Sequence, residues 1–203
     1  PTVSFGFTGW SRDVFPDSSK PILGPKSRAV LLALFLCPSI ALAQLPVAPY
    51  VSTPEADVEQ MLDMAAVAPG DYLIDLGSGD GRIVIAAARR GARAHGVELD
   101  PVLVQLAQQR AQQAGVAALA TFSHGDAFEA DLSAATVVTL YLLPEVNIAL
   151  KPKLLRELSP GARVISGNFD MGRWVPDRHE VSQSSGGIYL WGIPEEIPPG
   201  LLH

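Results

Sequence analysis

The chain has 203 residues, which suits one domain, and 48% of them are hydrophobic, enough to form a core. Its formal net charge is −6, and because four basic and two acidic residues precede Ala43, the remainder has a charge of −8. This acidic balance argues against nucleic acid as a partner, since phosphate binding needs clustered Lys and Arg. The single cysteine, Cys37, excludes disulfides, a cysteine–zinc site and a thiol nucleophile after it, and the four scattered histidines indicate no metal.

The N-terminal part of the chain is typical of an export signal. Residues 1–25 are rich in Pro, Gly and Ser, and we expect them to be disordered or upstream sequence. Residues 26–43 begin with basic residues, continue with an apolar stretch and end in Ala-Leu-Ala, the pattern of a secretory signal peptide. The sequence therefore predicts an exported protein, or one anchored through residues 29–43 at the periplasmic side of a membrane. A cytoplasmic protein is expected if this segment results from a miscalled start.

Residues 44–203 are predicted to form one domain of alternating strands and helices. A proline-punctuated arm at 44–52 leads to a helix that we expect to begin with Thr53 as its N-cap and Pro54 at its first position. The apolar pattern predicts strands at 71–76, 94–99, 118–123, 136–141 and 162–166, and helices at 82–90, 101–114 and 144–158. Residues 179–184 and 188–193 are predicted to pair as a hairpin that turns at Gly186 and Gly187. This order indicates an α/β fold with a doubly wound, mostly parallel seven-stranded sheet and a C-terminal antiparallel hairpin.

A glycine-rich turn follows the first predicted strand, with the sequence DLGSGDGR at residues 75–82. Glycines at alternate positions allow positive φ and let the backbone come close to a ligand, and the helix that follows offers free N–H groups. The spacing differs from the dinucleotide fingerprint, in which the third glycine comes three residues after the second. The candidate ligand-binding residues of this turn are Asp75, Gly77, Ser78, Gly79 and Gly81.

Two more acidic residues stand at or just beyond the ends of the next two predicted strands. Glu98 lies 17 residues after Gly81, where a carboxylate can accept both hydroxyls of a ribose. Asp126 follows the third strand, with Phe128 two residues later. The same residues also fit plainer roles: Asp75 and Asp126 as turn residues, Glu98 as a solvated charge, and Phe128 as part of the core.

The glycine turn together with these three acids resembles the seven-strand, or class I, S-adenosylmethionine-dependent methyltransferases. The resemblance implies the class I fold and S-adenosylmethionine rather than a nicotinamide cofactor. It also implies that Asp126 accepts the amino group of the adenine and that Phe128 covers the adenine ring.

Three further blocks resemble the lysine methyltransferases that act on the ATP synthase c subunit and the adenine nucleotide translocase, and their bacterial relatives. The blocks are PYVSTP at 49–54, TLYLLPEVN at 139–147 and PGARVIS at 160–166. The resemblance implies that Tyr50 and Thr53 close over the methionine end of the cofactor. It further implies that Tyr141, Glu145 and Asn147 line the acceptor channel. Ser52 and the pair Gly167-Asn168 depart from the family pattern, and both departures lie on the substrate side.

The reaction expected from this resemblance is an in-line displacement, which needs proximity and alignment more than a strong base. With no large insertion the site is expected to be open, which favours a protein substrate with an accessible lysine, and we expect a monomer. Plainer roles remain for the acceptor residues: Tyr141 in the core, and Glu145 and Asn147 at an ordinary helix N-terminus. Two other functions also remain: a small-molecule N- or O-methyltransferase, and a non-catalytic adenosylmethionine-binding envelope protein.

Overall fold

The computed structural model describes residues 52–184 and 186–202, all of which belong to a unit that spans Val47–His203. The predictions for residues 1–25 and 26–43, and the role predicted for Tyr50, lie outside the described residues. None of the helices in the described part is long and apolar enough to cross a membrane.

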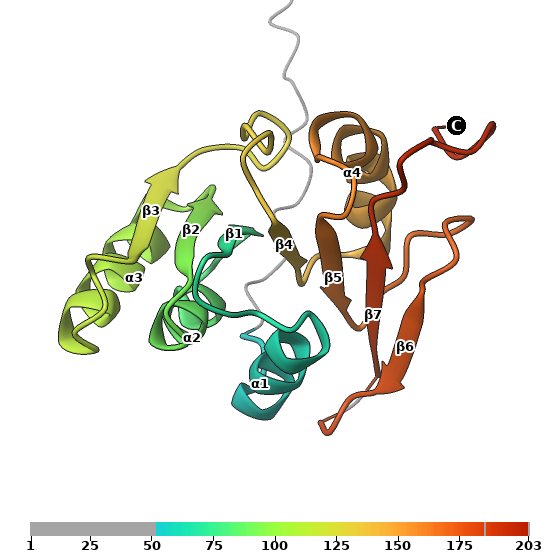
Figure 1. Ribbon diagram of the computed structural model, residues 1–203. Helices are drawn as coiled ribbons and strands as arrows, with labels where there is room; N and C mark the ends of the chain where they lie inside the picture. Colours follow the sequence, from blue (N-terminus) through green and yellow to red (C-terminus); the bar gives the residue numbers. More distant parts are fainter. Residues whose placement is uncertain (1–51, 185, 203) are drawn as a thin grey trace, which may run out of the picture. The chain divides into compact units, whose positions relative to one another are not determined.

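Seven strands form one sheet in the order β3-β2-β1-β4-β5-β7-β6 (Figure 1). Strands β1 to β5 pair in parallel, whereas β7 runs antiparallel to both β5 and β6. This confirms the predicted α/β fold, the seven-stranded sheet and the C-terminal hairpin. The strands are β1 Tyr72–Leu76, β2 Arg93–Glu98, β3 Ala120–His124, β4 Val137–Leu140, β5 Arg163–Gly167, β6 Arg178–Val181 and β7 Gly187–Gly192. The helices are α1 Glu55–Met64, α2 Arg82–Arg89, α3 Pro101–Gln113 and α4 Pro144–Glu157.

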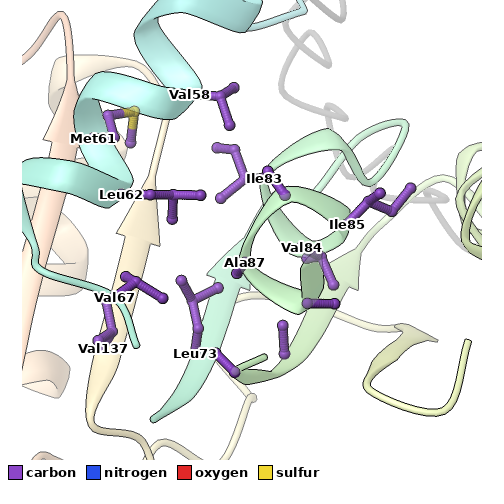
Figure 2. Close-up of a cluster of buried hydrophobic side chains, with 14 of the residues drawn as sticks. Val58, Met61, Leu62, Val67, Leu73, Ile83, Val84, Ile85, Ala87 and Val137 are labelled. Atoms are coloured by element: carbon purple, nitrogen blue, oxygen red, sulfur yellow. The ribbon is translucent and has the colours of Figure 1, made fainter. Parts of the chain in front are cut away.

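Each face of the sheet has its own apolar core, because successive strand residues point to opposite sides. On one face, Leu73 of β1 packs with α1, α2 and α3, and Figure 2 shows Val58 and Leu62 of α1 directed toward Ile83 of α2. On the other face, Ile74 belongs to a second cluster that includes the buried side of α4 and Trp191 of β7. The two clusters fix the sheet and therefore the edge at which its parallel strands end.

The first helix begins one residue later than the sequence predicted. Pro54, not Thr53, is the N-cap residue: its carbonyl accepts hydrogen bonds from the N–H groups of Asp57 and Val58, each at 3.0 Å. No side chain caps this helix, and the Thr53 carbonyl instead accepts a hydrogen bond from Nη1 of Arg82 at 2.6 Å. The predicted cap at Thr53 is therefore wrong, because proline's fixed φ suits the turn that precedes a helix as well as its first residue.

Helix α1 is tied to the loop of the C-terminal hairpin. The carboxylate of Asp57, which is almost fully buried, accepts hydrogen bonds from Oγ of Ser182 at 2.7 Å and from Oγ of Ser184 at 2.9 Å. Nearby, Nε2 of Gln60 donates to the carbonyl of Val181 at 3.0 Å. These contacts join the beginning of the described fold to its last two strands.

The connection between β3 and β4, at residues 125–136, contains turns and no helix. A cavity of about 470 Å³ lies there. Its lining includes Ile74, His95 and Ser123 from the strands and Asp126 and Glu129 from the connection.

Candidate active site

The candidate site lies at the carboxyl ends of β1 and β4, where the strand order reverses and where ligands of open α/β sheets bind. The turns after these two strands touch each other. A Cβ placed on Gly77 would lie 2.6 Å from Cδ2 of Leu142, and the φ of Gly77 is +78°. The positive φ and this close contact both favour glycine at position 77, where the two turns meet.

The rest of the glycine turn is held by backbone hydrogen bonds. The N–H groups of Gly77 and Ser78 both donate to the carbonyl of Val97, at 2.9 and 3.1 Å. Gly81 is the N-cap of α2 at φ +81°, and a Cβ there would lie 2.7 Å from the ring of Phe122. Gly81 therefore allows α2 to pack closely on the sheet, whereas Gly77 allows the glycine turn to meet Leu142.

Ser78 was predicted to contact the cofactor, and the structure turns its side chain away from the turn's outer surface. Its Oγ is buried with no hydrogen-bond partner in the described part of the chain, and it packs against Gly96, where a Cβ would lie 2.5 Å away. Any contact of Ser78 with a ligand is thus limited to its backbone.

Glu98 links the end of β2 to the glycine turn. Its Oε2 accepts a hydrogen bond from the N–H of Gly79 at 2.8 Å, and its Oε1 accepts one from the N–H of Asp100 at 2.9 Å. Each carboxylate oxygen can accept a second hydrogen bond. The two oxygens are therefore oriented by the backbone and retain the capacity to bind a pair of hydroxyls, as the sequence predicted for a ribose.

Asp75 lies beneath the turn. Only 2% of its surface is exposed, and its Oδ1 accepts a hydrogen bond from Oγ1 of Thr139 at 2.6 Å. Burial raises the pKa of Asp75 from its usual 3.8 to about 7, and the charges of Glu98 and Asp80 add to this effect. Asp75 is thus close to half-protonated near neutral pH, and it can take or release a proton in response to a ligand's charge.

At the far end of the site, two exposed apolar side chains follow the two strand-end acids. Phe128 is 44% exposed and Leu99 is 58% exposed, and their neighbours Asp126 and Glu98 come one or two residues earlier. The alternative that Phe128 belongs to the core is therefore wrong. Oδ1 of Asp126 accepts a hydrogen bond from the N–H of Phe128 at 2.9 Å, so Asp126 does act as a turn residue. Its carboxylate still has lone pairs that can accept a hydrogen bond from a ligand. Leu99 was not singled out from the sequence, although an apolar residue directly after a strand-end acid was the available signal.

A buried ionic cluster supports the turn from behind, and sequence reasoning did not find it. Asp80 is 3% exposed and pairs with Arg82, whose Nη2 lies 2.6 Å from Oδ2, and with Arg110 of α3. Because Arg82 also donates to the carbonyl of Thr53, the cluster joins the turn to the residue that precedes α1. Thr53 itself is buried, so its predicted closing role over a cofactor stays a prediction.

The residues after β4 are those predicted to form the acceptor side. Tyr141 is partly buried, and its Oη accepts a hydrogen bond from Nδ2 of Asn168 at 2.5 Å. Burial, followed by the negative charge of Asp57, raises the pKa of Tyr141 above its usual value, so its hydroxyl is protonated at neutral pH. Glu145 is exposed in the first turn of α4.

Asn147 occupies a different environment from the other two predicted acceptor residues. It is fully buried, and its Nδ2 donates to Oγ of Ser166 at 2.9 Å and to the carbonyl of Phe169 at 3.3 Å. These bonds make it a support for the end of β5. Its role in catalysis stays a prediction that this geometry does not favour.

The electrostatics of the site suit a cationic ligand. The negative charge comes from Glu98 beside the glycine turn and Asp126 beyond β3, because Asp80 is already paired with two arginines and the pKa of Asp75 is raised to about 7. A sulfonium and an ammonium are favoured near such carboxylates, whereas a pyrophosphate is not. In the described ranges no three His, Cys, Asp or Glu side chains are grouped to hold a metal.

This sheet order and this site define an S-adenosylmethionine-dependent methyltransferase of the class I fold. Residues 75–178 match the family described as the ANTKMT methyltransferase domain, and the chain belongs to that family. Over 159 residues it is 42% identical to a protein-lysine N-methyltransferase of Saccharolobus islandicus, with 76% of this chain and 99% of that protein covered. Over 163 residues it is 41% identical to the adenine nucleotide translocase lysine N-methyltransferase of Mus musculus, with 74% of this chain and 71% of that protein covered.

A solved structure from Salinibacter ruber is also similar to this chain. It is described as an RNA methyltransferase in complex with S-adenosyl-L-homocysteine. It is 58% identical with a TM-score of 0.72, and the match covers 74% of this chain and 99% of that one. The cofactor predicted from the glycine turn is thus confirmed, while these relatives differ in the substrate that their descriptions give.

Proposed function

We propose that this protein methylates a lysine side chain of a protein substrate. The observation that supports this proposal most directly is the neutral, oriented hydroxyl of Tyr141 beside the turn after β4, next to the Gly77–Leu142 contact. A hydroxyl of this kind can accept an N–H of an amine, and it cannot act as a strong base while it remains protonated. The names of the relatives from Saccharolobus islandicus and Mus musculus support lysine as the acceptor.

The chemistry asks for few residues. When bound, S-adenosylmethionine supplies an electrophilic methyl group, which forms a bond to the lysine nitrogen as its bond to sulfur breaks and the electron pair stays on sulfur. Glu98 would orient the cofactor through its ribose, and Gly77 lets the glycine turn lie directly against Leu142. The lysine must arrive neutral, and removing its ammonium from water lowers its pKa from about 10.4. Tyr141 would then hold one amine N–H while the nitrogen lone pair faces the methyl carbon.

The surface around the acceptor side suits a macromolecule. Leu143 and Ile148, at the beginning of α4, are 47% and 45% exposed. Gly172 packs beside Ile148, where a Cβ would lie 3.7 Å from its Cδ1, so the loop after β5 extends the same surface. These exposed apolar residues near the beginning of α4 fit a protein substrate that has an apolar segment beside its lysine.

RNA is the second candidate substrate, because of the description given to the Salinibacter ruber structure. The charge of this chain argues against it: the formal net charge is −6, and the cofactor side is lined by acidic residues. Lysine therefore remains the better-supported acceptor.

The proposal is tested by incubating the purified chain with radiolabelled S-adenosylmethionine and three separate substrates. These are detergent-solubilised ATP synthase c subunit, adenine nucleotide translocase, and total RNA. We expect label in a lysine of one of the two proteins, located by mass spectrometry, and loss of most of that label with Tyr141→Phe. Label in RNA alone would overturn the proposal. Cofactor binding in a calorimeter without transfer to these substrates or to a small-molecule extract would instead support a non-catalytic binding protein.

Location at a membrane is a second part of the proposal and rests on the sequence of residues 29–43. Fractionating cells that express the whole chain or a chain starting at Gln44 tests it. We expect only the whole chain in the membrane or exported fraction, and equal partitioning of both would remove this part of the proposal. Gel filtration of the shorter chain checks the expected monomer.

A further inference from the structure

We infer that Asn168 is a positioning residue, whose side-chain amide fixes the Tyr141 hydroxyl in the orientation that receives the lysine amine. The inference rests on the proposed function and adds to it a residue that comes from the loop after β5. Three observations support it: the backbone of Asn168, the two ends of its amide, and the packing of the Tyr141 ring.

The backbone of Asn168 forms a tight three-residue turn at the end of β5. The N–H of Phe169 donates to the carbonyl of Gly167 at 2.9 Å, and Asn168 between them has φ +66°. Asparagine tolerates this left-handed region better than most residues, but glycine tolerates it best. Asparagine at this position indicates that its side chain is needed.

The two ends of the Asn168 amide have different environments. Nδ2 donates to Oη of Tyr141 at 2.5 Å, across 27 positions of sequence. Oδ1 is buried with no hydrogen-bond partner among the described residues, and it packs so closely against Gly186 that a Cβ there would overlap it. Gly186 belongs to the hairpin turn, so that turn closes on the amide and holds it against Tyr141. A buried oxygen without a partner lowers stability, which again favours a functional reason for this side chain.

The Tyr141 ring is held from a second direction. A Cβ on Gly167 would overlap two carbons of the ring, Cδ2 and Cε2, so the ring lies directly against the backbone of Gly167. With the ring fixed by Gly167 and one lone pair of Oη occupied by Asn168, only two directions remain, shared by the O–H hydrogen and the second lone pair. An amine N–H that donates to this lone pair leaves the nitrogen's own lone pair free to attack.

The chemical step consumes nothing from either residue. The nitrogen lone pair forms the new N–C bond, the C–S bond breaks with its electrons going to sulfur, and the methylated ammonium later releases a proton to water. Tyr141 stays protonated throughout, because burial and the nearby Asp57 carboxylate raise its pKa. Asp57 is held in place by Ser182 and Ser184, and Asn168 is the group that donates to the hydroxyl itself.

The decisive variant is Asn168→Gly, which suits the positive φ and deletes only the amide. We expect unchanged or higher thermal stability and unchanged calorimetric affinity for S-adenosylhomocysteine. The kcat should fall at least about tenfold, with little change in the KM for the protein substrate. The matched control is Ala66→Gly, because Ala66 is the other described non-glycine residue with positive φ, at +49°, and it lies outside the site. This control should leave kcat unchanged. A normal kcat in Asn168→Gly would overturn the inference.

Two further measurements separate positioning from a general structural effect. In a Tyr141→Phe background, Asn168→Gly should cause no further loss of kcat, and a full additional loss would show that Asn168 does not act through Tyr141. Ultraviolet titration of the tyrosines, with Tyr141→Phe as the difference reference, should show a higher pKa for Tyr141 in Asn168→Gly, because the hydrogen bond from Asn168 lowers that pKa. An unchanged titration would also overturn the inference. If the wild-type chain methylates no lysine, the proposed function fails, while the titration still decides whether Asn168 controls the Tyr141 hydroxyl.

Discussion

Replacing the buried Asp75 with asparagine should stabilise the protein, and should do so more at high pH than at low pH. The carboxylate is almost fully buried, with Thr139 as its hydrogen-bond donor, and burial raises its pKa from 3.8 to about 7. Because the pKa is higher in the folded state, the folded protein keeps a proton that the unfolded chain has already released. The stability associated with neutral Asp75 is therefore complete below about pH 4 and is lost as pH rises through about 7.

The magnitude follows from the two pKa values. The difference between 3.8 and about 7 corresponds to about 4 kcal/mol when the carboxylate is fully ionised, and to about 2 kcal/mol near pH 5. The asparagine amide of the variant can still accept the hydrogen bond from Thr139, and any cost of its extra N–H groups is the same at every pH. The quantity to compare is the unfolding free energy of Asp75→Asn minus that of the wild type. This difference should increase by about 2 to 3 kcal/mol between about pH 5 and pH 8.

Urea denaturation of the ligand-free wild type and Asp75→Asn at about pH 5, 6, 7 and 8 measures this quantity directly. The difference between their unfolding free energies should widen as pH rises, and the variant should be the more stable protein at pH 8. A constant difference across this range would show that Asp75 is not the titrating buried group, and would refute the reasoning. The same variant should bind S-adenosylhomocysteine more weakly at pH 8, because it has lost the negative charge beneath the turn.

Three other substitutions test separate parts of the site. Glu98→Ala should weaken cofactor binding about 100-fold or more in calorimetry, because it removes the acceptor of the Gly79 N–H together with the acceptor proposed for the ribose. A near-normal affinity would contradict the assignment of Glu98 to the ribose. Gly77→Ala should lower the unfolding free energy by about 2 kcal/mol and impair cofactor binding. Adding Leu142→Ala should restore only the part of the unfolding free energy that is lost through the 2.6 Å contact, because the backbone strain at φ +78° remains. Asp80→Asn should lower the free energy of urea unfolding by about 2 kcal/mol, since it leaves two arginines without their buried carboxylate, and an unchanged midpoint would show that the cluster is not structural.

The sequence was sufficient for those parts of the site that are formed within a few residues. The glycine turn, Glu98 at the end of β2 and the hairpin turn at Gly186 all follow from local spacing and periodicity, and the structure has them where they were predicted. Most element ends shifted by one or two residues, as for β2, which was predicted at 94–99 and is found at Arg93–Glu98. The strand predicted at 179–184 ends three residues early and is found at Arg178–Val181. Such shifts arise because a terminal residue's state depends on its hydrogen bonds, as with Pro54 and Thr53.

The parts that sequence reasoning missed depend on contacts between distant residues. Asp80 meets Arg110 across 30 positions, and Asn168 reaches Tyr141 only because β4 and β5 pair with Leu140 opposite Ser166. A local pattern contains no information about that register. Asn147 shows the converse: the family resemblance implied a place in the acceptor channel, but the structure buries its side chain, which donates to Ser166 at the end of β5.

The bond network around Asp57 has a consequence for how the protein is made. Its partners Ser182 and Ser184 come 125 and 127 positions later, and α1 also packs against β5 and β7. On the ribosome, the first helix of the described fold emerges long before the strands that bury it, so its docking waits for nearly the whole chain. The environment of Tyr141 also depends on residues that are synthesised late, because Asn168 donates to its hydroxyl and Gly186 of the hairpin turn packs against Asn168. A nascent or C-terminally truncated chain can therefore complete the glycine turn and still lack the contacts that hold Tyr141, so under the proposed function methyl transfer would begin only after synthesis of the last strands.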